Sequence, residues 1–173
     1  MAHLFEQAPT GRSKCRGCAG AIAKGELRFG ERLPNPFAEG EMTHWFHPVC
    51  AAYKRPEPIL ESLELAPGEL RDRLEAAAKG SLLQPRLPRI DGAELAPGSQ
   101  ASCRQCREKI EKGSWRVRLV FHEEGVFSPA GYIHLGCRKA YFETDEILEQ
   151  VLHFSPALGE EARAALAAAF GDS

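Results

Sequence analysis

The chain of 173 residues is long enough for one or two small domains, and each half alone can bury only a thin core. A formal net charge of −2 argues against a protein that coats nucleic acid through overall positive charge. No apolar run reaches membrane-spanning length, and no apolar stretch follows Met1 as in a secretory signal. We therefore expect a soluble protein without a membrane partner.

The first half of the chain carries two pairs of metal-ligand residue types. Cys15-x2-Cys18 is followed, after a gap of 28 residues, by His47-x2-Cys50. The gap is longer than the roughly 12 to 20 residues common in small fingers. The spacing therefore predicts that a metal ion holds together a small β-rich module.

Apolar and basic residues alternate between these two pairs. Leu27, Phe29 and Leu33 are apolar, whereas Arg28 and Arg32 lie between them. This period of two predicts a strand with an apolar inner face and a partly basic outer face.

An alanine-rich segment follows the second ligand pair. Glu69 to Lys79 places Leu70, Leu74 and Ala77 on one face of a helix that we expect to end at Gly80. A stretch rich in Pro and Gly then indicates a linker. We expect a first module over residues 1–80 and a linker over residues 81–92.

Residues 93–173 repeat this order as a second module. The ligand residues, with a gap of 27 residues between the pairs, are Cys103, Cys106, His134 and Cys137. Glu6 and Arg28 also recur 88 positions later as Glu94 and Arg116. The chain is therefore predicted to be a tandem array of two similar modules.

The second module repeats the predicted elements as well. Trp115, Val117, Leu119 and Phe121 alternate with more polar residues, which predicts a strand. A final alanine-rich helix can open at Ser155-Pro156 and end at Gly171.

All six cysteines belong to these two ligand sets. Three thiolates and one imidazole complete a tetrahedral zinc shell and leave no position for water or substrate. Disulfides are the alternative for an even number of cysteines, but the matching histidines favour metal. We expect two zinc ions and a fold of small α+β zinc-binding modules, two tandem Cys-Cys-His-Cys fingers, each a short antiparallel sheet followed by helices.

Charge is segregated along the chain despite the small net value. Lys and Arg outnumber Asp and Glu in residues 11–32 and 100–120, whereas acidic residues dominate after residue 142. A basic stripe on each finger is the pattern expected for contact with phosphates, although an ordinary solvated face would also show it.

Three segments of the first module, Gly11–Cys18, Ile22–Arg28 and His44–Cys50, resemble the zinc finger of poly(ADP-ribose) polymerases. A eukaryotic DNA ligase carries a finger of the same kind. Residues 103–113 of the second module are similar to the same family. The resemblance covers residues 5–80 and 93–171, nearly the whole chain.

The resemblance implies binding to DNA where the duplex is interrupted, by contacts to the backbone and by apolar side chains laid on the exposed base pair. For the first finger it implies backbone contacts from Arg12 and Arg28 and apolar contacts from Phe37 and Met42. Lys14 and Arg16 flank these arginines and could add contacts to the backbone. Phe37 could instead fold back onto its own finger. We expect Trp45 to pack in the core around the metal.

The second finger departs from the family pattern. Gln100 stands where the first finger has Arg12, and no clear counterpart of Phe37 exists. We expect Arg116 and Arg118 to contribute backbone contacts and Phe127, beside Val126, to contribute one apolar contact. A purely scaffolding second finger remains an alternative.

The function predicted from the sequence is recognition of DNA strand breaks in damage sensing or repair, by a protein that is not an enzyme. Filled zinc shells leave no place for an activated water, and we expect no small-molecule substrate. A single-stranded DNA or RNA binder and a zinc-stabilised adaptor for unspecified protein partners remain alternatives. We expect the cytoplasm, with nucleoid association, in a prokaryote and the nucleus in a eukaryote.

Overall fold

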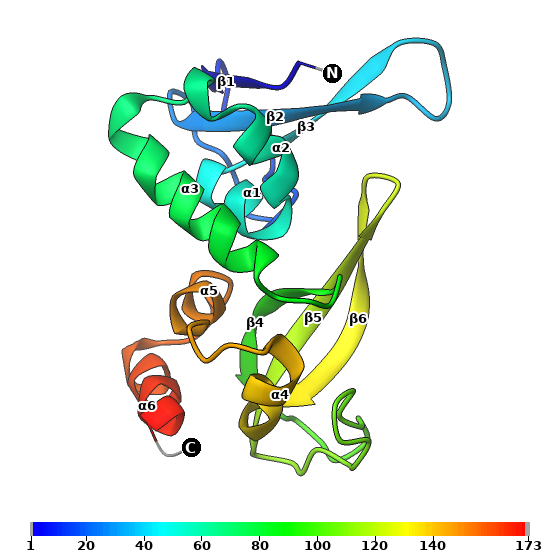
Figure 1. The fold of residues 1–173 in the computed structure, drawn as a ribbon, viewed down its shortest axis with the longest axis vertical. Coiled ribbons are helices and arrows are strands. Elements are labelled where there is room, and N and C mark those ends of the chain that lie inside the picture. The colour runs from blue at the N-terminus through cyan, green and yellow to red at the C-terminus, as the bar shows by residue number, and fades with distance from the viewer. Residues whose placement is uncertain (1, 172–173) are drawn as a thin grey trace. The chain divides into compact units, whose positions relative to one another are not determined.

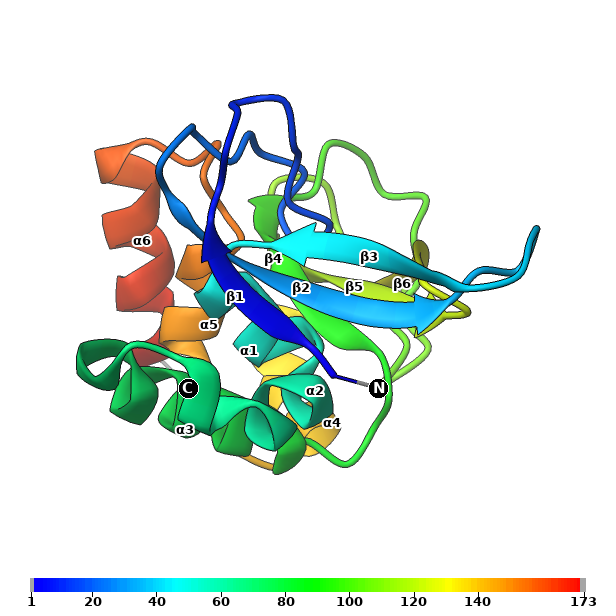
Figure 2. The ribbon, with the colours of Figure 1, turned by 90° about the horizontal axis from the view of Figure 1, so that it is seen from above.

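The computed structural model describes residues 2–171, which form two compact units divided between Leu82 and Leu83. Each unit contains one three-stranded antiparallel sheet and a set of helices (Figures 1 and 2). The predicted fold class, two small α+β modules with one ligand cluster each, is confirmed.

The sheet of the first unit has the order β1-β2-β3. Its strands and helices are β1 (Leu4–Gln7), β2 (Leu27–Pro34), β3 (Glu41–Phe46), α1 (Pro48–Lys54), α2 (Pro56–Glu61), the 3-10 helix η1 (Leu63–Leu65) and α3 (Gly68–Leu82). The helices α1 and α2 both begin at a proline, a residue that suits the first turn because the N–H there needs no helical partner. Both pack against α3, and buried Phe29, Ile59 and Leu74 contribute to the core.

The helix α3 is longer than expected, because it continues through Gly80 to Leu82. Its buried residues are Leu74, Ala78 and Ser81, and the Ser81 hydroxyl donates a 2.6 Å hydrogen bond to the Tyr53 carbonyl. This bond and the packing on α1 extend the helix beyond the glycine at which propensity alone would end it.

The sheet of the second unit has the order β4-β5-β6. Its elements are β4 (Arg89–Leu95), β5 (Trp115–Glu123), β6 (Val126–His134), the 3-10 helix η2 (Leu135–Cys137), α4 (Arg138–Phe142), α5 (Leu148–His153) and α6 (Glu160–Gly171). The helix α5 packs against β4, and Leu166 and Phe170 are the buried residues of α6.

Two boundaries in the second unit differ from expectation. Residues 89–92 of the expected linker lie in β4, and Gly92 (φ 100°) lies at the register shift of this strand. The position is a glycine because the Phe154 carbonyl leaves no room for a side chain there. The last helix begins at Glu160, since Ser155 instead closes α5 through a hydrogen bond from its hydroxyl to the Val151 carbonyl.

The hairpins β2–β3 and β5–β6 extend beyond the body of their own units (Figure 1). The first ends in a loop over residues 35–40, closed by a 3.0 Å hydrogen bond from the Asn35 amide to the Gly40 carbonyl. Within residues 2–171, the helices are all too short or too polar to cross a bilayer.

Replacing two glycines of the first unit by alanine should change its stability in opposite directions. A methyl group at Gly30 would lie 2.7 Å from the Trp45 ring and 2.8 Å from Thr43, whereas one at Gly80 meets no atom within 4 Å. Gly30→Ala should therefore lower the free energy of unfolding of this unit by about 1–3 kcal/mol. Gly80→Ala should raise it by roughly 0.5–1 kcal/mol, because alanine is the better helix former.

Urea denaturation of the zinc-loaded protein, followed by circular dichroism and by Trp fluorescence, measures both changes. A stabilising Gly30→Ala would contradict the close packing of β2 on β3.

Candidate metal centres and nucleic-acid interface

The four ligand residues of each unit converge on one point. Their sulfur and nitrogen atoms all lie within 4.8 Å of one another in each cluster. In the first unit, the His47 Nδ1 lies 3.4 Å from the Cys18 sulfur and 3.8 Å from the Cys50 sulfur. A tetrahedral zinc ion places nitrogen and sulfur ligands about 3.6 Å apart, so these distances fit zinc.

The second cluster repeats this geometry. The His134 Nδ1 lies 3.3 Å from the Cys106 sulfur and 3.8 Å from the Cys137 sulfur. Both clusters are assembled in the same way, from a turn before the second strand of the sheet and from the start of the helices after the third strand.

A backbone carbonyl orients each histidine ring. The Nε2 of His47 lies 3.1 Å from the Ala21 carbonyl oxygen, and that of His134 lies 3.0 Å from the Lys109 carbonyl oxygen. Each Nε2 therefore carries the proton and donates to the carbonyl, which leaves the Nδ1 lone pair for a metal.

Backbone amides point at the sulfur atoms of both clusters. The Cys15 sulfur accepts hydrogen bonds from the amides of Gly17 (3.3 Å) and His47 (3.2 Å). The Cys103 sulfur accepts the same pair of bonds from Gln105 and His134, both at 3.3 Å. Such donors stabilise a thiolate rather than a thiol.

The thiol pKa values of the second cluster differ widely, because one thiolate disfavours the ionisation of the next. Burial raises the pKa of Cys103, but the amides of Cys106, His134 and Gln105 outweigh it and lower the value to about 7. Burial and the neighbouring Cys103 raise the pKa of Cys137 to about 12. Adjacent thiolates repel one another, so the three sulfurs can be charged together only around a cation.

The residues present fit zinc in both units, in ligand type, in number and in separation. Zinc bound there would have four protein ligands and would serve the fold. Within residues 2–171, two clusters of Cys, His, Asp or Glu side chains could hold a metal ion, and they are the two ligand sets predicted from the sequence.

Arg28, expected to contact the DNA backbone, lies buried with 6% of its surface exposed. Its guanidinium donates to the Ser13 hydroxyl (2.7 Å) and to Glu6 (2.6 Å), and it stacks 3.5 Å above the Trp45 ring. The side chains of Glu6 on β1 and Trp45 on β3 therefore cover Arg28, and its guanidinium is engaged within the protein.

The environment of Trp45 also differs from expectation. The core position beside the first cluster belongs to Phe46, which is 1% exposed, whereas Trp45 is half-buried beneath Arg28. Adjacent strand residues point to opposite faces, and the sequence motif alone did not show which of the two faces the metal.

The second unit contains the same stack. Arg116 lies 3.7 Å above the Tyr132 ring and donates to Glu94, which also accepts a 2.6 Å bond from Arg118. Burial raises the pKa of Glu94, but the bonds from Arg116 and Arg118 outweigh it and hold the value below its usual range. The two predicted contact arginines of this unit are thus engaged within the protein.

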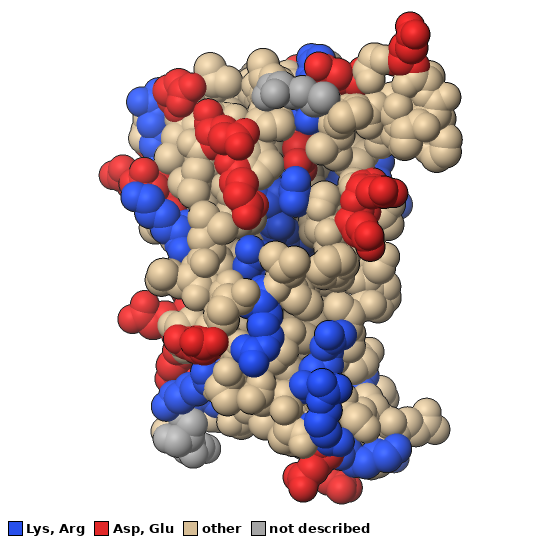
Figure 3. Space-filling model, turned by 45° about the vertical axis from the view of Figure 1, so that its right-hand side comes forward, with Lys and Arg blue, Asp and Glu red and all other residues tan. Residues whose placement is uncertain are grey.

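Other predicted cations of the first unit are available to a partner. Arg12, Lys14 and Arg16 are exposed around Cys15, and their side chains form no hydrogen bond or ion pair in the described part of the chain. On the faces that Figure 3 shows, Lys and Arg form several groups, with Asp and Glu beside them.

The predicted apolar contacts have different environments. Phe37 is 93% exposed at the tip of the β2–β3 hairpin, so it does not fold back onto its finger. Its amide bonds the Asn35 side chain at 2.9 Å, which fixes the turn. Met42 is half-buried in β3 opposite Leu33.

The tip of the β5–β6 hairpin exposes no aromatic ring as fully as the β2–β3 hairpin exposes Phe37. Phe127 is half-buried, with its ring centroid 4.7 Å from that of His122. The exposed apolar residue there is Val126, at 57%.

Residues 6–76 match the profile of the poly(ADP-ribose) polymerase and DNA-ligase zinc-finger region. They are a zinc finger of the poly(ADP-ribose) polymerase type. The match, the closed ligand shell and the fold agree with the resemblance seen in the sequence. The second unit repeats the ligand set and the sheet of this finger.

Several curated proteins are similar to the chain over more than one unit. A poly(ADP-ribose) polymerase of Drosophila melanogaster is 27% identical over 157 residues, covering 79% of this chain and 16% of the relative. One of Sarcophaga peregrina is 30% identical over 69% of this chain and 14% of the relative. The polynucleotide 3′-phosphatase ZDP of Arabidopsis thaliana is 25% identical over 90% of this chain and 26% of the relative.

The chain spans about a quarter or less of the length of these relatives. The region that they share with it is a small part of each enzyme.

Replacing one ligand should separate the two metal sites. Cys106→Ser should lower the zinc content from two ions per chain to one and unfold the second unit, because structural zinc contributes about 10–16 kcal/mol to folding in finger peptides. The reciprocal variant Cys18→Ser should unfold the first unit instead. Native mass spectrometry gives the zinc content, and amide NMR spectra show which unit remains folded.

Two zinc ions retained in either variant would show that the mutated cysteine is not a ligand.

Proposed function

We propose that this chain is a zinc-dependent DNA-binding protein that recognises interrupted duplexes such as nicks, gaps and ends. The observation that carries the proposal is Phe37, an aromatic side chain almost wholly exposed on a loop that the zinc-held sheet projects into solvent. An exposed aromatic ring is costly in water and favourable on an unstacked base.

The exposed cations of the first finger supply the second half of this interaction. Arg12, Lys14 and Arg16 are close to Cys15 in the sequence, are exposed, and form no ion pair with the acidic residues of the described chain. Contacts to phosphates give affinity without sequence information, whereas a base face is accessible only where stacking is interrupted. Together, the two contacts recognise a structure rather than a sequence.

The finger match and the names of the relatives support this proposal. Enzymes that make poly(ADP-ribose) or remove 3′ phosphates from polynucleotides share this region with the chain. We propose that the chain performs binding rather than catalysis, since four protein ligands fill each predicted zinc shell.

The stacking contact predicts a loss of selectivity in Phe37→Ala. The affinity for a nicked or gapped duplex should fall by roughly 1–3 kcal/mol, while the affinity for a closed duplex stays unchanged. The matched control is Leu65→Ala, which removes another exposed apolar side chain of the same unit. Fluorescence anisotropy at fixed, near-physiological salt measures both affinities. An unchanged preference for breaks in Phe37→Ala would contradict the stacking role.

The phosphate contact predicts a different signature in Arg12→Gln. Binding should weaken on every duplex, and the slope of log K against log salt should fall by about one unit. Arg73→Gln on α3 removes the same charge from an exposed helix position and should change neither quantity.

Single-stranded DNA and RNA probes belong in the same titrations. Tighter binding to a single strand than to any interrupted duplex would replace the proposed substrate with single strands.

A further inference from the structure

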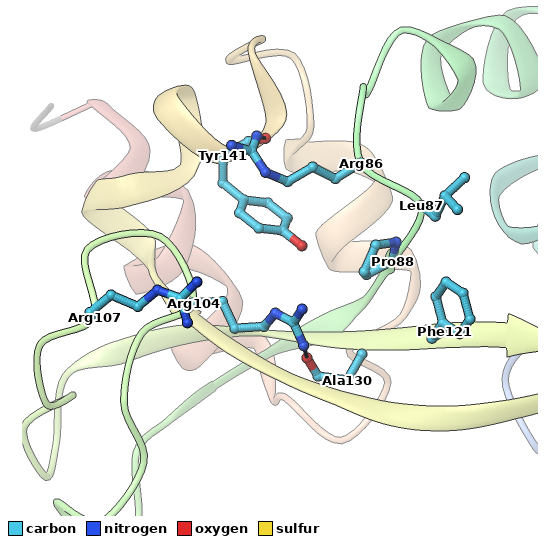
Figure 4. A pocket seen from close by; sticks show the side chains of 8 residues that line it. All are labelled: Arg86, Leu87, Pro88, Arg104, Arg107, Phe121, Ala130 and Tyr141. Carbon is cyan, nitrogen blue, oxygen red and sulfur yellow. Dashed lines mark hydrogen bonds between the residues drawn. The ribbon is translucent and has the colours of Figure 1, made fainter.

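The second unit contains a pocket of about 430 Å³, whose lining includes none of the four predicted zinc ligands. It lies between the segment before β4, the turn that carries Cys103 and Cys106, the strands β5 and β6, and α4 (Figure 4). Its lining residues are Arg86, Leu87, Pro88, Arg104, Arg107, Phe121, Ala130 and Tyr141. Three of these residues are arginines, and none is acidic.

Two of the arginines are anchored by backbone carbonyls. The Arg86 guanidinium donates a 2.5 Å bond to the Tyr141 carbonyl and lies 4.7 Å from the Tyr141 ring centroid. The Arg104 guanidinium donates a 2.6 Å bond to the Ala130 carbonyl. Each bond uses one of five N–H donors, so both groups are held in place with donors to spare.

The chain makes room for Arg104 at Gly131. A side chain there would meet the Arg104 Cδ at 3.0 Å, and the glycine adopts φ 96°. Arg107 is exposed, and its side chain forms no hydrogen bond or ion pair in residues 2–171. No acidic side chain of the described chain therefore neutralises these three guanidiniums through an ion pair.

The Tyr141 hydroxyl points into the same space (Figure 4). Tyr141 is 3% exposed, and its hydroxyl forms no hydrogen bond within the described chain. The hydroxyl is not among the fully buried polar atoms, so it is accessible from the pocket and free to bond a ligand oxygen there. Leu87, Pro88 and Phe121 form an apolar side of the pocket suited to a sugar or base.

We propose that this pocket binds a phosphomonoester of a nucleotide, the group found at a phosphorylated nucleic-acid strand end and in free nucleotides. Three guanidiniums and a hydroxyl match a dianion with three oxygens better than the singly charged phosphodiester of a continuous backbone. A terminal group can also enter a pocket, whereas a continuous strand must pass over it. That the bound phosphomonoester belongs to a DNA strand end rests on the proposed function. That the pocket binds a phosphomonoester at all rests only on its own residues.

The test compares gapped duplexes that differ in one group: a 5′ phosphate, a 3′ phosphate, or hydroxyls at both ends of the gap. The zinc-loaded full chain should bind one phosphorylated duplex about tenfold tighter than the hydroxyl duplex in anisotropy titrations. Arg107→Gln and Tyr141→Phe should reduce this ratio towards one. Neither variant removes a hydrogen bond of the described chain, so both should keep the wild-type fold.

Arg73→Gln is the charge-matched control and should keep the full ratio, because it lies outside the pocket. A preference that survives in Arg107→Gln, or the absence of any preference between phosphate and hydroxyl ends, would exclude the strand end as ligand.

A second arm separates this site from the proposed function. Titration of 2′-deoxyadenosine 5′-monophosphate should shift the NMR signals of the Arg104 and Arg107 side chains, and the shifts should saturate. Titration of 2′-deoxyadenosine, which has no phosphate, should not shift them. Shifts without any binding of duplex DNA would keep the phosphomonoester site and reject strand-break recognition. No shift with the nucleotide, together with equal affinity for phosphate and hydroxyl ends, would overturn the proposal.

Discussion

The convergence of three cysteine sulfurs and one imidazole nitrogen within 4.8 Å is the constraint on which each unit depends. These groups come from a turn before the second strand and from the chain just after the third strand, so one metal ion ties together segments that are far apart in sequence. Backbone amides and a carbonyl complete the arrangement around each cluster. A unit of about 80 to 90 residues with a thin core gains from a metal the stability that a larger protein takes from burial.

The ligands, the tandem organisation and the class of fold were predictable from the sequence, because the spacing of cysteine and histidine is set by coordination chemistry rather than by packing. The environment of Arg28 was not. Alternation places Arg28 on the outer face of its strand, but only the structure shows that Glu6 and Trp45 cover this face. A signal was present, since Glu6 and Arg28 recur together as Glu94 and Arg116 at the same separation, which is typical of paired residues.

Tertiary packing also decided the boundaries that the sequence misplaced. Gly80 is a plausible helix end by propensity, yet the contact of α3 with α1 and the bond of Ser81 extend the helix to Leu82. Gly92 reads as part of a linker, but it lies in a strand where only a glycine fits beside the Phe154 carbonyl. The arginine pocket could not be predicted, because its residues come from five segments between Arg86 and Tyr141 that only the fold brings together.

The two units share one scaffold and present different surfaces. The first exposes cations around its first zinc ligand and an aromatic ring at its hairpin tip. The second has Gln100 in place of Arg12, and its Arg116 and Arg118 donate hydrogen bonds to Glu94. Three other arginines of this unit line a pocket. The ligand cluster and the sheet are therefore common to both units, and the difference lies in the side chains around them.

X-ray absorption at the zinc edge of the purified full chain tests the central claim most directly. Two zinc ions per chain, each with three sulfur neighbours at about 2.3 Å and one nitrogen at about 2.0 Å, would agree with closed structural shells in both units. A shell dominated by oxygen or nitrogen, or a protein whose cysteines are joined as disulfides without zinc, would contradict the account from the metal centres upward.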